Sequence, residues 1–318
     1  MADAEFLDRV FTMEVGRCTE AAAIAASTMI GRGDKEGADQ AAVTALREAF
    51  NKLEMDGTVV IGEGERDEAP MLYIGEKVGS GRGPKVDIAL DPLEGTTLTA
   101  KAMSNALAVV AMAQGGTLLH APDVYMQKIA VGPGYPEGVV DLDASVEDNI
   151  TSLAKAKGVE TSEITLCVLD RERHENIISG ARKMNSRVFL IPDGDVAGVF
   201  HTTEEHTGID MYVGSGGAPE GVLAAAALRC VGGQMQGRLL FRNDAERGRA
   251  EKAGITDLDR KYGLRELASG DVMFAATGVT NGTMLDGVKW ERGFVSTHTV
   301  VMRSKSGTVR YIRAKSRR

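Results

Sequence analysis

Short apolar, β-branched runs alternate with helical patterns along this chain, and no other feature constrains its fold as strongly. Apolar residues recur every three or four positions from Leu7 to Met29, which predicts an amphipathic helix. The runs Thr58–Ile61, Val86–Leu90 and Ile164–Leu169 are typical of short buried strands. Helical stretches are expected from Met71 onward and at His174–Met184, the latter after the third run. Such alternation predicts a layered α/β architecture.

The length of the chain favours more than one compact unit. At 318 residues, about two domains are expected. A polar stretch at 141–163 interrupts the alternation of apolar segments. We therefore expect one domain at 1–155 and a second at 156–318.

Charge and composition exclude several classes of partner. Acidic residues number 45 and basic residues 37, a net charge of −8 that disfavours a nucleic-acid partner. No apolar run approaches the length of a membrane span, and the N-terminal residues show no export pattern. Cys18, Cys167 and Cys230 lack metal-binding spacing and indicate a reducing compartment. We expect a cytoplasmic protein with no membrane partner.

Glycine and acidic residues gather in four short segments. The 38 glycines exceed the usual share, and many fall between apolar runs, where the chain turns or approaches a ligand. The four segments are 31–39, 61–68, 87–97 and 214–221. Each lies where a strand or turn meets a helix or loop, which is where α/β proteins bind ligands.

The segment 87–97 is the most informative of the four. Asp91 follows an apolar run, Glu94 lies three residues later, and Gly95 and Thr96 complete the turn. Converging carboxylates repel one another unless a cation neutralises them. Oxygen ligands suit Mg²⁺ or Mn²⁺, and the N–H groups around Gly95 suit phosphate oxygens. This combination indicates metal-assisted hydrolysis of a phosphate ester.

Other chemistries fit the sequence less well. The segment 214–221 follows a strand and opens a helix, but its glycine spacing is not that of a dinucleotide-binding loop, and Pro219 interrupts it. The flanks of Ser215 lack the spacing of a hydrolase nucleophile. His174 is expected to be structural.

Several motifs together resemble one family. The run Asp91–Thr96 (DPLEGT) resembles the signature of the lithium-sensitive, metal-dependent sugar phosphatase superfamily. Within it, three further segments resemble the class II fructose-1,6-bisphosphatase family of the bacterial glycerol-regulon type: 31–39, 61–73 and 216–225. The resemblance extends from about residue 5 to about residue 310. It implies a layered α-β-α-β-α sandwich and a homo-oligomer, either a dimer or a tetramer.

The resemblance also implies a set of metal ligands and catalytic residues. Mn²⁺ or Mg²⁺ would be held by carboxylates from both halves of the chain: Asp39, Glu63, Asp91, Glu94 and Glu220. Thr96 would orient the attacking water, and Lys35 would lie in the active site together with Asp39 and Glu63. Domain 1–155 would thus bind metal and phosphate, and domain 156–318 the sugar phosphate.

The substrate-binding residues implied by the resemblance lie in five places. They are Glu94, Gly95 and Thr96; Tyr125; Arg171, Glu172 and Arg173; Asp193, Gly194 and Asp195; and Gly217. The arginines suit bidentate binding of phosphate. Glu172 occupies a position where proline is commoner in the family.

The implied activity is hydrolysis of the 1-phosphate of fructose 1,6-bisphosphate, which yields fructose 6-phosphate and phosphate in gluconeogenesis. One alternative is an enzyme that also accepts sedoheptulose 1,7-bisphosphate, although the short segment Gly79–Lys85 disfavours it. A second is an inositol monophosphatase-like enzyme. A third, of another class, is a non-catalytic sensor of a divalent cation or a sugar phosphate.

Overall fold

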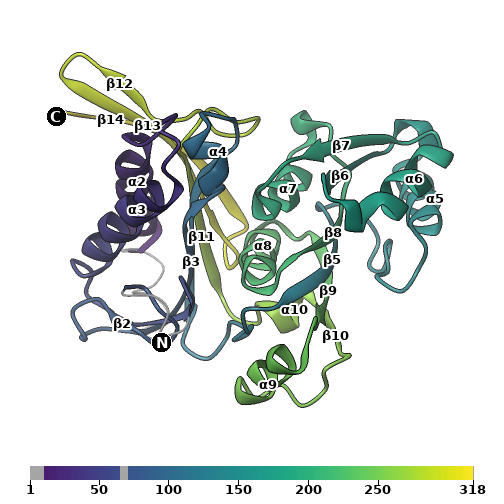
Figure 1. Ribbon diagram of the computed structural model, residues 1–318, viewed down its shortest axis with the longest axis horizontal. Coiled ribbons are helices and arrows are strands. Elements are labelled where there is room, and N and C mark those ends of the chain that lie inside the picture. The colour runs from purple at the N-terminus through teal and green to yellow at the C-terminus, as the bar shows by residue number, and fades with distance from the viewer. Residues whose placement is uncertain (1–10, 65–70, 318) are drawn as a thin grey trace. The chain divides into compact units, whose positions relative to one another are not determined.

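The computed structural model describes residues 11–64 and 71–317. The chain forms two compact units (Figure 1). The first unit comprises Met1–Leu119 together with Gly270–Arg318, and the second comprises His120–Ser269. Among the described helices, none is both long and apolar enough to cross a membrane.

The first unit is built on an eight-stranded mixed sheet with the order β12-β13-β11-β4-β3-β1-β2, in which β14 also pairs with β13. Only β1 and β3 run parallel among its described pairs. The strands are β1 (Asp56–Ile61), β2 (Lys77–Val78), β3 (Lys85–Glu94), β4 (Leu107–Gln114), β11 (Val272–Gly278), β12 (Lys289–Glu291), β13 (Phe294–Arg303) and β14 (Thr308–Arg317).

Two helices, α2 (Phe11–Ser27) and α3 (Lys35–Phe50), lie side by side on one face of this sheet (Figure 1). Their buried apolar side chains join those of β1, β3 and β4 in one core. Asp34 caps α3 because its carboxylate accepts the N–H of Gly37 at 2.8 Å. The cap sets the start of α3 at Lys35 and therefore the place of Asp39 along the helix.

The second unit contains a six-stranded mixed sheet with the order β10-β9-β5-β8-β6-β7. Helices α7 and α8 cover one face, and α5 and α6 pack on the other (Figure 1). The strands are β5 (Tyr125–Val131), β6 (Thr165–Leu169), β7 (Arg187–Ile191), β8 (Met211–Gly217), β9 (Gln234–Leu240) and β10 (Lys261–Gly263). The helices are α5 (Val146–Lys157), α6 (Glu175–Lys183), α7 (Asp195–Phe200), α8 (Ala218–Val231), α9 (Asp244–Lys252) and α10 (Leu264–Leu267).

The expected α/β class is confirmed, because each unit layers helices on a mixed sheet. The expected helix from Met71 onward is wrong. Leu72 has a left-handed backbone with φ 56°, and the short strand β2 pairs with β1 five residues later. The apolar residues here fill the core beneath α3 rather than one face of a helix.

The compact units differ from the expected domains, 1–155 and 156–318. The polar stretch at 141–163 contains α5, whose Ile150 and Leu153 are fully buried in the core of the second unit. Strand β11, which follows the second unit in the sequence, pairs with β4 and so returns the chain to the first unit. The assignment of metal binding and sugar binding to separate halves stays a prediction.

Candidate active site

The turn between β3 and the short helix α4 (Thr96–Ala100) places four predicted residues together. The pairing of β3 with β4 is irregular between Asp91 and Glu94, because Pro92 cannot donate a ladder hydrogen bond. The carboxylate of Asp91 accepts the N–H of Leu93 at 3.0 Å, and Glu94 is 5% exposed. Both carboxyl groups therefore belong to the tightly turned end of one strand.

Gly95 is required at this turn by its backbone conformation. Its φ of 85° is left-handed, and an added Cβ would lie 2.7 Å from Leu98 Cδ1. The next residue, Thr96, is the first of α4 and is half-buried. The chain thus presents a carboxylate, a flexible backbone link and a hydroxyl in three consecutive positions.

Asp39 and Glu63 lie near Asp91, although they come from other elements. Asp39 is half-buried on α3, and Glu63 follows β1. Burial, and then the charge of Asp91, raises the pKa of Asp39 to about 6, while a side-chain hydrogen bond with Glu63 opposes this rise. The three predicted ligands are therefore close enough to interact electrostatically.

Contacts between backbone and side chains fix the position of Glu63. Its N–H donates to the carbonyl of Leu72 at 3.1 Å, and the N–H of Leu72 in turn donates to the carboxylate of Glu76. Arg47 on α3 holds the other oxygen of Glu76 at 2.6 Å. A chain of contacts thus joins α3 to Glu63.

The donor set in the first unit fits a hard divalent cation. Asp39, Glu63, Asp91 and Glu94 offer only carboxylate oxygens, and burial together with the charge of Asp91 raises the pKa of Asp39. Within 11–64 and 71–317, no three His, Cys, Asp or Glu side chains form a preformed metal cluster. The carboxylates therefore fit a cation by chemistry and proximity, and the ligand assignments stay predictions.

In the second unit, Tyr125 and Arg173 form a contact between an aromatic ring and a cation. The guanidinium carbon of Arg173 lies 5.1 Å from the centroid of the Tyr125 ring. Arg173 is anchored by Ser215, whose carbonyl accepts from its terminal nitrogen at 2.8 Å and whose hydroxyl lies 3.1 Å from its Nε. Arg171 lies 3.8 Å from a carboxylate oxygen of Asp193. The first pair joins two predicted substrate-binding residues, Tyr125 and Arg173. The second joins Arg171, which is predicted to bind phosphate, to Asp193, which is predicted to contact the sugar.

A buried lysine that the sequence analysis did not select links two other predicted residues. Lys128 on β5 is 1% exposed, and its ammonium group forms an ion pair with Asp195. It also donates to the carbonyl of Gly217 at 2.7 Å. Asp195 starts α7, directly after Gly194, and Gly217 ends β8. A lysine between the inward-facing Met126 and Ala130 of β5 was the available signal.

His174 is structural, as expected. It is 1% exposed, its Nδ1 lies 2.8 Å from the carbonyl of Leu169, and its Nε2 accepts the N–H of Ser215 at 2.8 Å. Burial and the nearby charges of Arg173 and Arg171 lower the pKa of His174. The neutral ring therefore braces the strand that anchors Arg173.

The other predicted residues occupy exposed or partly exposed positions. Lys35 is the first residue of α3, and Glu172 begins a 3₁₀ turn before α6; both are exposed. Glu220 lies in the first turn of α8, and a Cβ at Gly217 would lie 1.9 Å from its Oε2. Gly217 is therefore needed for the side chain of Glu220 to lie against the backbone. The role of Glu220 as a metal ligand stays a prediction.

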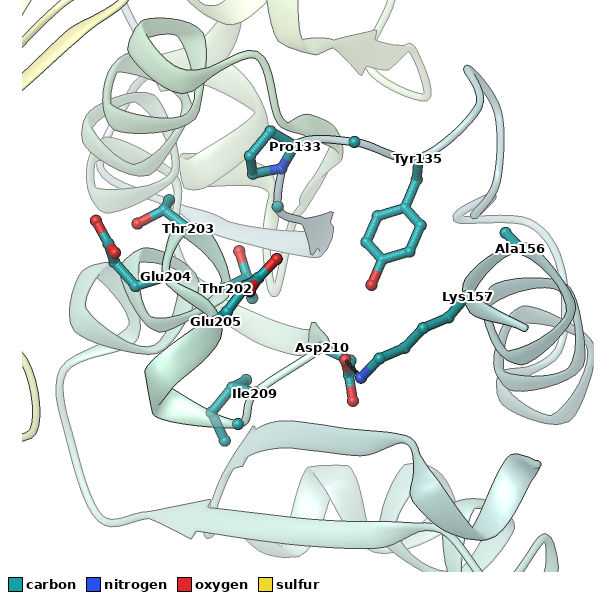
Figure 2. A pocket seen from close by; sticks show the side chains of 13 residues that line it. Pro133, Tyr135, Ala156, Lys157, Thr202, Thr203, Glu204, Glu205, Ile209 and Asp210 are labelled. Carbon is teal, nitrogen blue, oxygen red and sulfur yellow. Dashed lines mark hydrogen bonds and ion pairs between the residues drawn. The ribbon is translucent and has the colours of Figure 1, made fainter. Parts of the chain in front are cut away.

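A cavity of about 550 Å³ in the second unit is lined by other residues (Figure 2). The Tyr135 hydroxyl points toward the ion pair of Lys157 and Asp210, and Glu204 and Glu205 also line the cavity. Three carboxylates and one ammonium give this lining a net negative charge, which opposes an anionic sugar phosphate. None of the predicted site residues lines it.

Comparison with known proteins identifies related sequences. The model of a family described as "Bacterial fructose-1,6-bisphosphatase, glpX-encoded" matches residues 9–316. The chain is 44% identical over 326 aligned positions to "Fructose-1,6-bisphosphatase 1 class 2" of Escherichia coli K12, covering 96% of this chain and 95% of the relative. The same identity and coverage hold for "Fructose-1,6-bisphosphatase class 2" of Escherichia coli O6:H1 and of Shigella flexneri.

Proposed function

This chain belongs to the family of glpX-encoded bacterial fructose-1,6-bisphosphatases, and we propose that it hydrolyses the 1-phosphate ester of fructose 1,6-bisphosphate. One structural observation carries the proposal most strongly. The interaction of Asp39 with Asp91 and Glu63 gathers carboxylates from α3, β3 and the segment after β1, and Asp91 also lies on the strand that ends at the Glu94–Gly95–Thr96 turn. Acidic groups beside such a turn suit a phosphate that is neutralised by cations.

The proposed cofactor is Mn²⁺ or Mg²⁺. Its ligands would be Asp39, Glu63, Asp91, Glu94 and Glu220. When bound, the cation would neutralise phosphoryl charge and lower the pKa of a coordinated water. The chain itself supplies the ionised carboxylates and the fixed backbone that hold these groups in place.

Thr96 would position the attacking water with its hydroxyl, and the backbone N–H groups around Gly95 would donate to phosphoryl oxygens. The water oxygen forms the new bond to phosphorus as the bond from phosphorus to the C1 oxygen breaks. The C1 oxygen leaves with the sugar and takes up the proton that the attacking water releases, so the products are fructose 6-phosphate and phosphate. The placement of Thr96 at the start of α4 supports this role, because its backbone is fixed by the turn.

The second unit would bind the rest of the substrate. Arg171 and Arg173 would hold a phosphate, and Tyr125 would contact the substrate. The turn Asp193–Asp195 would contact the sugar, and Gly217 would make a backbone contact. Glu172 is expected in the same phosphate loop. The anchoring of Arg173 by Ser215, together with the buried link through Lys128, supports these roles, since both hold the groups before substrate arrives.

The proposal includes a biological setting. We place the reaction in gluconeogenesis and in the cytoplasm, carried out by a homo-oligomer (dimer or tetramer) with a sugar bisphosphate as its small-molecule partner. Cys18, Cys167 and Cys230 are buried and form no disulfide, which agrees with a reducing compartment.

The decisive experiment is an assay of phosphate release by the purified protein after removal of divalent cations with a chelator. Release from fructose 1,6-bisphosphate should return on addition of Mn²⁺ or Mg²⁺. Sedoheptulose 1,7-bisphosphate and inositol 1-phosphate, assayed in parallel, separate the alternative substrates. A protein that binds Mn²⁺ and the sugar bisphosphate but releases no phosphate would be a sensor, and the proposed activity would be abandoned.

A further inference from the structure

Arg242 lies beside Tyr125 because of the strand register in the second unit. Tyr125 on β5 is directly opposite Leu240 on β9, and on its other side it is opposite Gly217 on β8. Arg242 follows Leu240 by two residues. The guanidinium carbon of Arg242 lies 4.9 Å from the centroid of the Tyr125 ring. Sequence reasoning did not select this residue.

Two guanidinium groups therefore contact a single tyrosine ring. Arg173 lies 5.1 Å from the ring centroid and Arg242 lies 4.9 Å from it. Two cations at one ring repel each other, so the arrangement favours an anion that both can contact. Tyr125 adds a hydroxyl, which can donate to an anionic oxygen.

Arg242 is held in place by a buried carboxylate. Glu246 is 1% exposed; it accepts from the Nε of Arg242 at 2.6 Å and from its backbone N–H at 2.7 Å. The side chain of Arg242 is nevertheless 64% exposed. A guanidinium has five N–H donors, so a group anchored through its Nε edge retains donors for a second, planar anion.

The local charge is opposite to that of the whole chain. Arg249 also lies near Glu246, with 3.9 Å between its terminal nitrogen and the carboxylate oxygen. Arg242 and Arg249 thus lie beside one buried carboxylate, and Arg242 shares the Tyr125 ring with Arg173, in a chain whose net charge is −8. A concentration of arginines in an acidic protein selects an anionic ligand at this place.

We propose that Arg242 is a phosphate-binding residue that acts with Arg173 and Tyr125 on the phosphate that is not hydrolysed, which makes it a determinant of bisphosphate specificity. This inference rests on the proposed function, in which Thr96 and the carboxylates of the first unit act on the other phosphate. Fructose 1,6-bisphosphate carries the second phosphate, whereas fructose 1-phosphate lacks it.

Steady-state kinetics of Arg242→Ala with both substrates test the proposal. The KM for fructose 1,6-bisphosphate should rise roughly ten- to hundredfold, as expected for loss of a charged hydrogen bond, while kcat changes little. Kinetics with fructose 1-phosphate should not change. Arg242→Lys should give an intermediate KM, because lysine keeps the positive charge but lacks the paired N–H donors of the planar guanidinium. This variant also provides the test if the alanine variant does not fold.

Arg260 supplies a matched control in the same unit. It lies 5.2 Å from the centroid of the Tyr262 ring, pairs with Glu266, and has a side chain that is 51% exposed. Arg260→Ala should leave the ratio of the two KM values unchanged. An Arg242→Ala variant with the wild-type ratio, or with an equal loss of kcat on both substrates, would overturn the role of Arg242. A wild-type protein that releases no phosphate would instead overturn the proposed function.

Discussion

Lys128 and Asp195 form an ion pair inside the second unit, where their side chains are 1% and 6% exposed. The same ammonium group donates to the carbonyl of Gly217 at 2.7 Å. One lysine on β5 thus joins the start of α7 to the end of β8. Because a buried charge is costly without its partner, the pair is expected to hold both segments in one arrangement.

Lys128→Met should lower the free energy of unfolding by about 3–5 kcal/mol, since it leaves the charge of Asp195 buried and unpaired. Denaturant unfolding measures this loss. Lys261→Met is the control, because Lys261 pairs with Asp141 at 2.8 Å in a more exposed setting and is expected to contribute at most about 1 kcal/mol. Lys128→Met/Asp195→Leu should recover stability without recovering affinity for fructose 1,6-bisphosphate. Recovery of both would show that the pair is only structural.

Thr96→Ala should reduce kcat by about a hundredfold or more, because the attacking water loses the hydroxyl that orients it. Folding and Mn²⁺ binding should not change, and Thr96→Ser should restore most turnover. Thr97→Ala, one residue along the same helix, is the matched control and should retain activity. Full activity of Thr96→Ala would remove this hydroxyl from the mechanism.

Loss of a hydrogen-bond partner of a metal ligand weakens metal binding roughly 10–100-fold. Asp91→Asn alters a proposed ligand itself, so it should raise the half-saturating Mn²⁺ concentration by more than this. The dependence of activity on Mn²⁺ concentration measures the change. Asp87 on the same strand is the comparison, since its carboxylate accepts the N–H groups of Gly116 at 2.7 Å and Thr117 at 3.0 Å. Asp87→Asn should lower stability and leave the Mn²⁺ requirement unaltered. If Asp87→Asn instead raised the Mn²⁺ requirement and Asp91→Asn only lowered stability, Asp87 would be the metal ligand and Asp91 the structural residue.

The stability of the metal-free protein should fall as the pH rises through about 6. Burial and Asp91 raise the pKa of Asp39 from 3.8 to about 6, so the folded protein keeps a proton that the unfolded chain has already lost. This contribution to stability is complete below the pKa of Asp39 in the unfolded chain. It is lost as the pH rises through the pKa of Asp39 in the folded protein. Mn²⁺ binds the ionised carboxylate, so the increase in the protein's Tm on addition of Mn²⁺ should be larger at pH 7.5 than at pH 5. Asp39→Asn should abolish the difference, and equal gains in the native protein would contradict this account.

Local motifs made part of the site predictable. The Asp91–Thr96 run determines its own turn, because Pro92 and Gly95 constrain the backbone within a few residues. Lys128 was not predictable in this way, since its partner Asp195 lies 67 positions away and the pair exists only in the folded sheet. Arg242 likewise depends on the register of β9 with β5.

The fold shows the same limit. Strand and helix periodicity predicted the α/β class, because each element carries its own pattern of apolar residues. Periodicity could not show that β11 pairs with β4, because that contact joins segments far apart in the chain. The apolar run from Met71 onward forms no helix, because Leu72 adopts a left-handed backbone conformation that the apolar pattern does not reveal.

Glu76 is expected to act on metal binding through Leu72 and Glu63, although it is not a predicted ligand. It is 5% exposed, binds Arg47 at 2.6 Å, and accepts the N–H of Leu72, whose carbonyl accepts the N–H of Glu63. Glu76→Gln should weaken Mn²⁺ binding roughly tenfold, with kcat restored at saturating Mn²⁺, because Glu63 loses part of its support.

Titration of activity with Mn²⁺ measures the effect of Glu76→Gln, and Glu54→Gln is the control. Glu54 pairs with Arg82 at 3.9 Å, and both side chains are largely exposed, at 70% and 79%. Its loss should change neither Tm nor the half-saturating Mn²⁺ concentration. A Glu76→Gln variant with a lower Tm but the wild-type Mn²⁺ requirement would limit Glu76 to a structural role, because the weakened support would then not reach the carboxylate of Glu63.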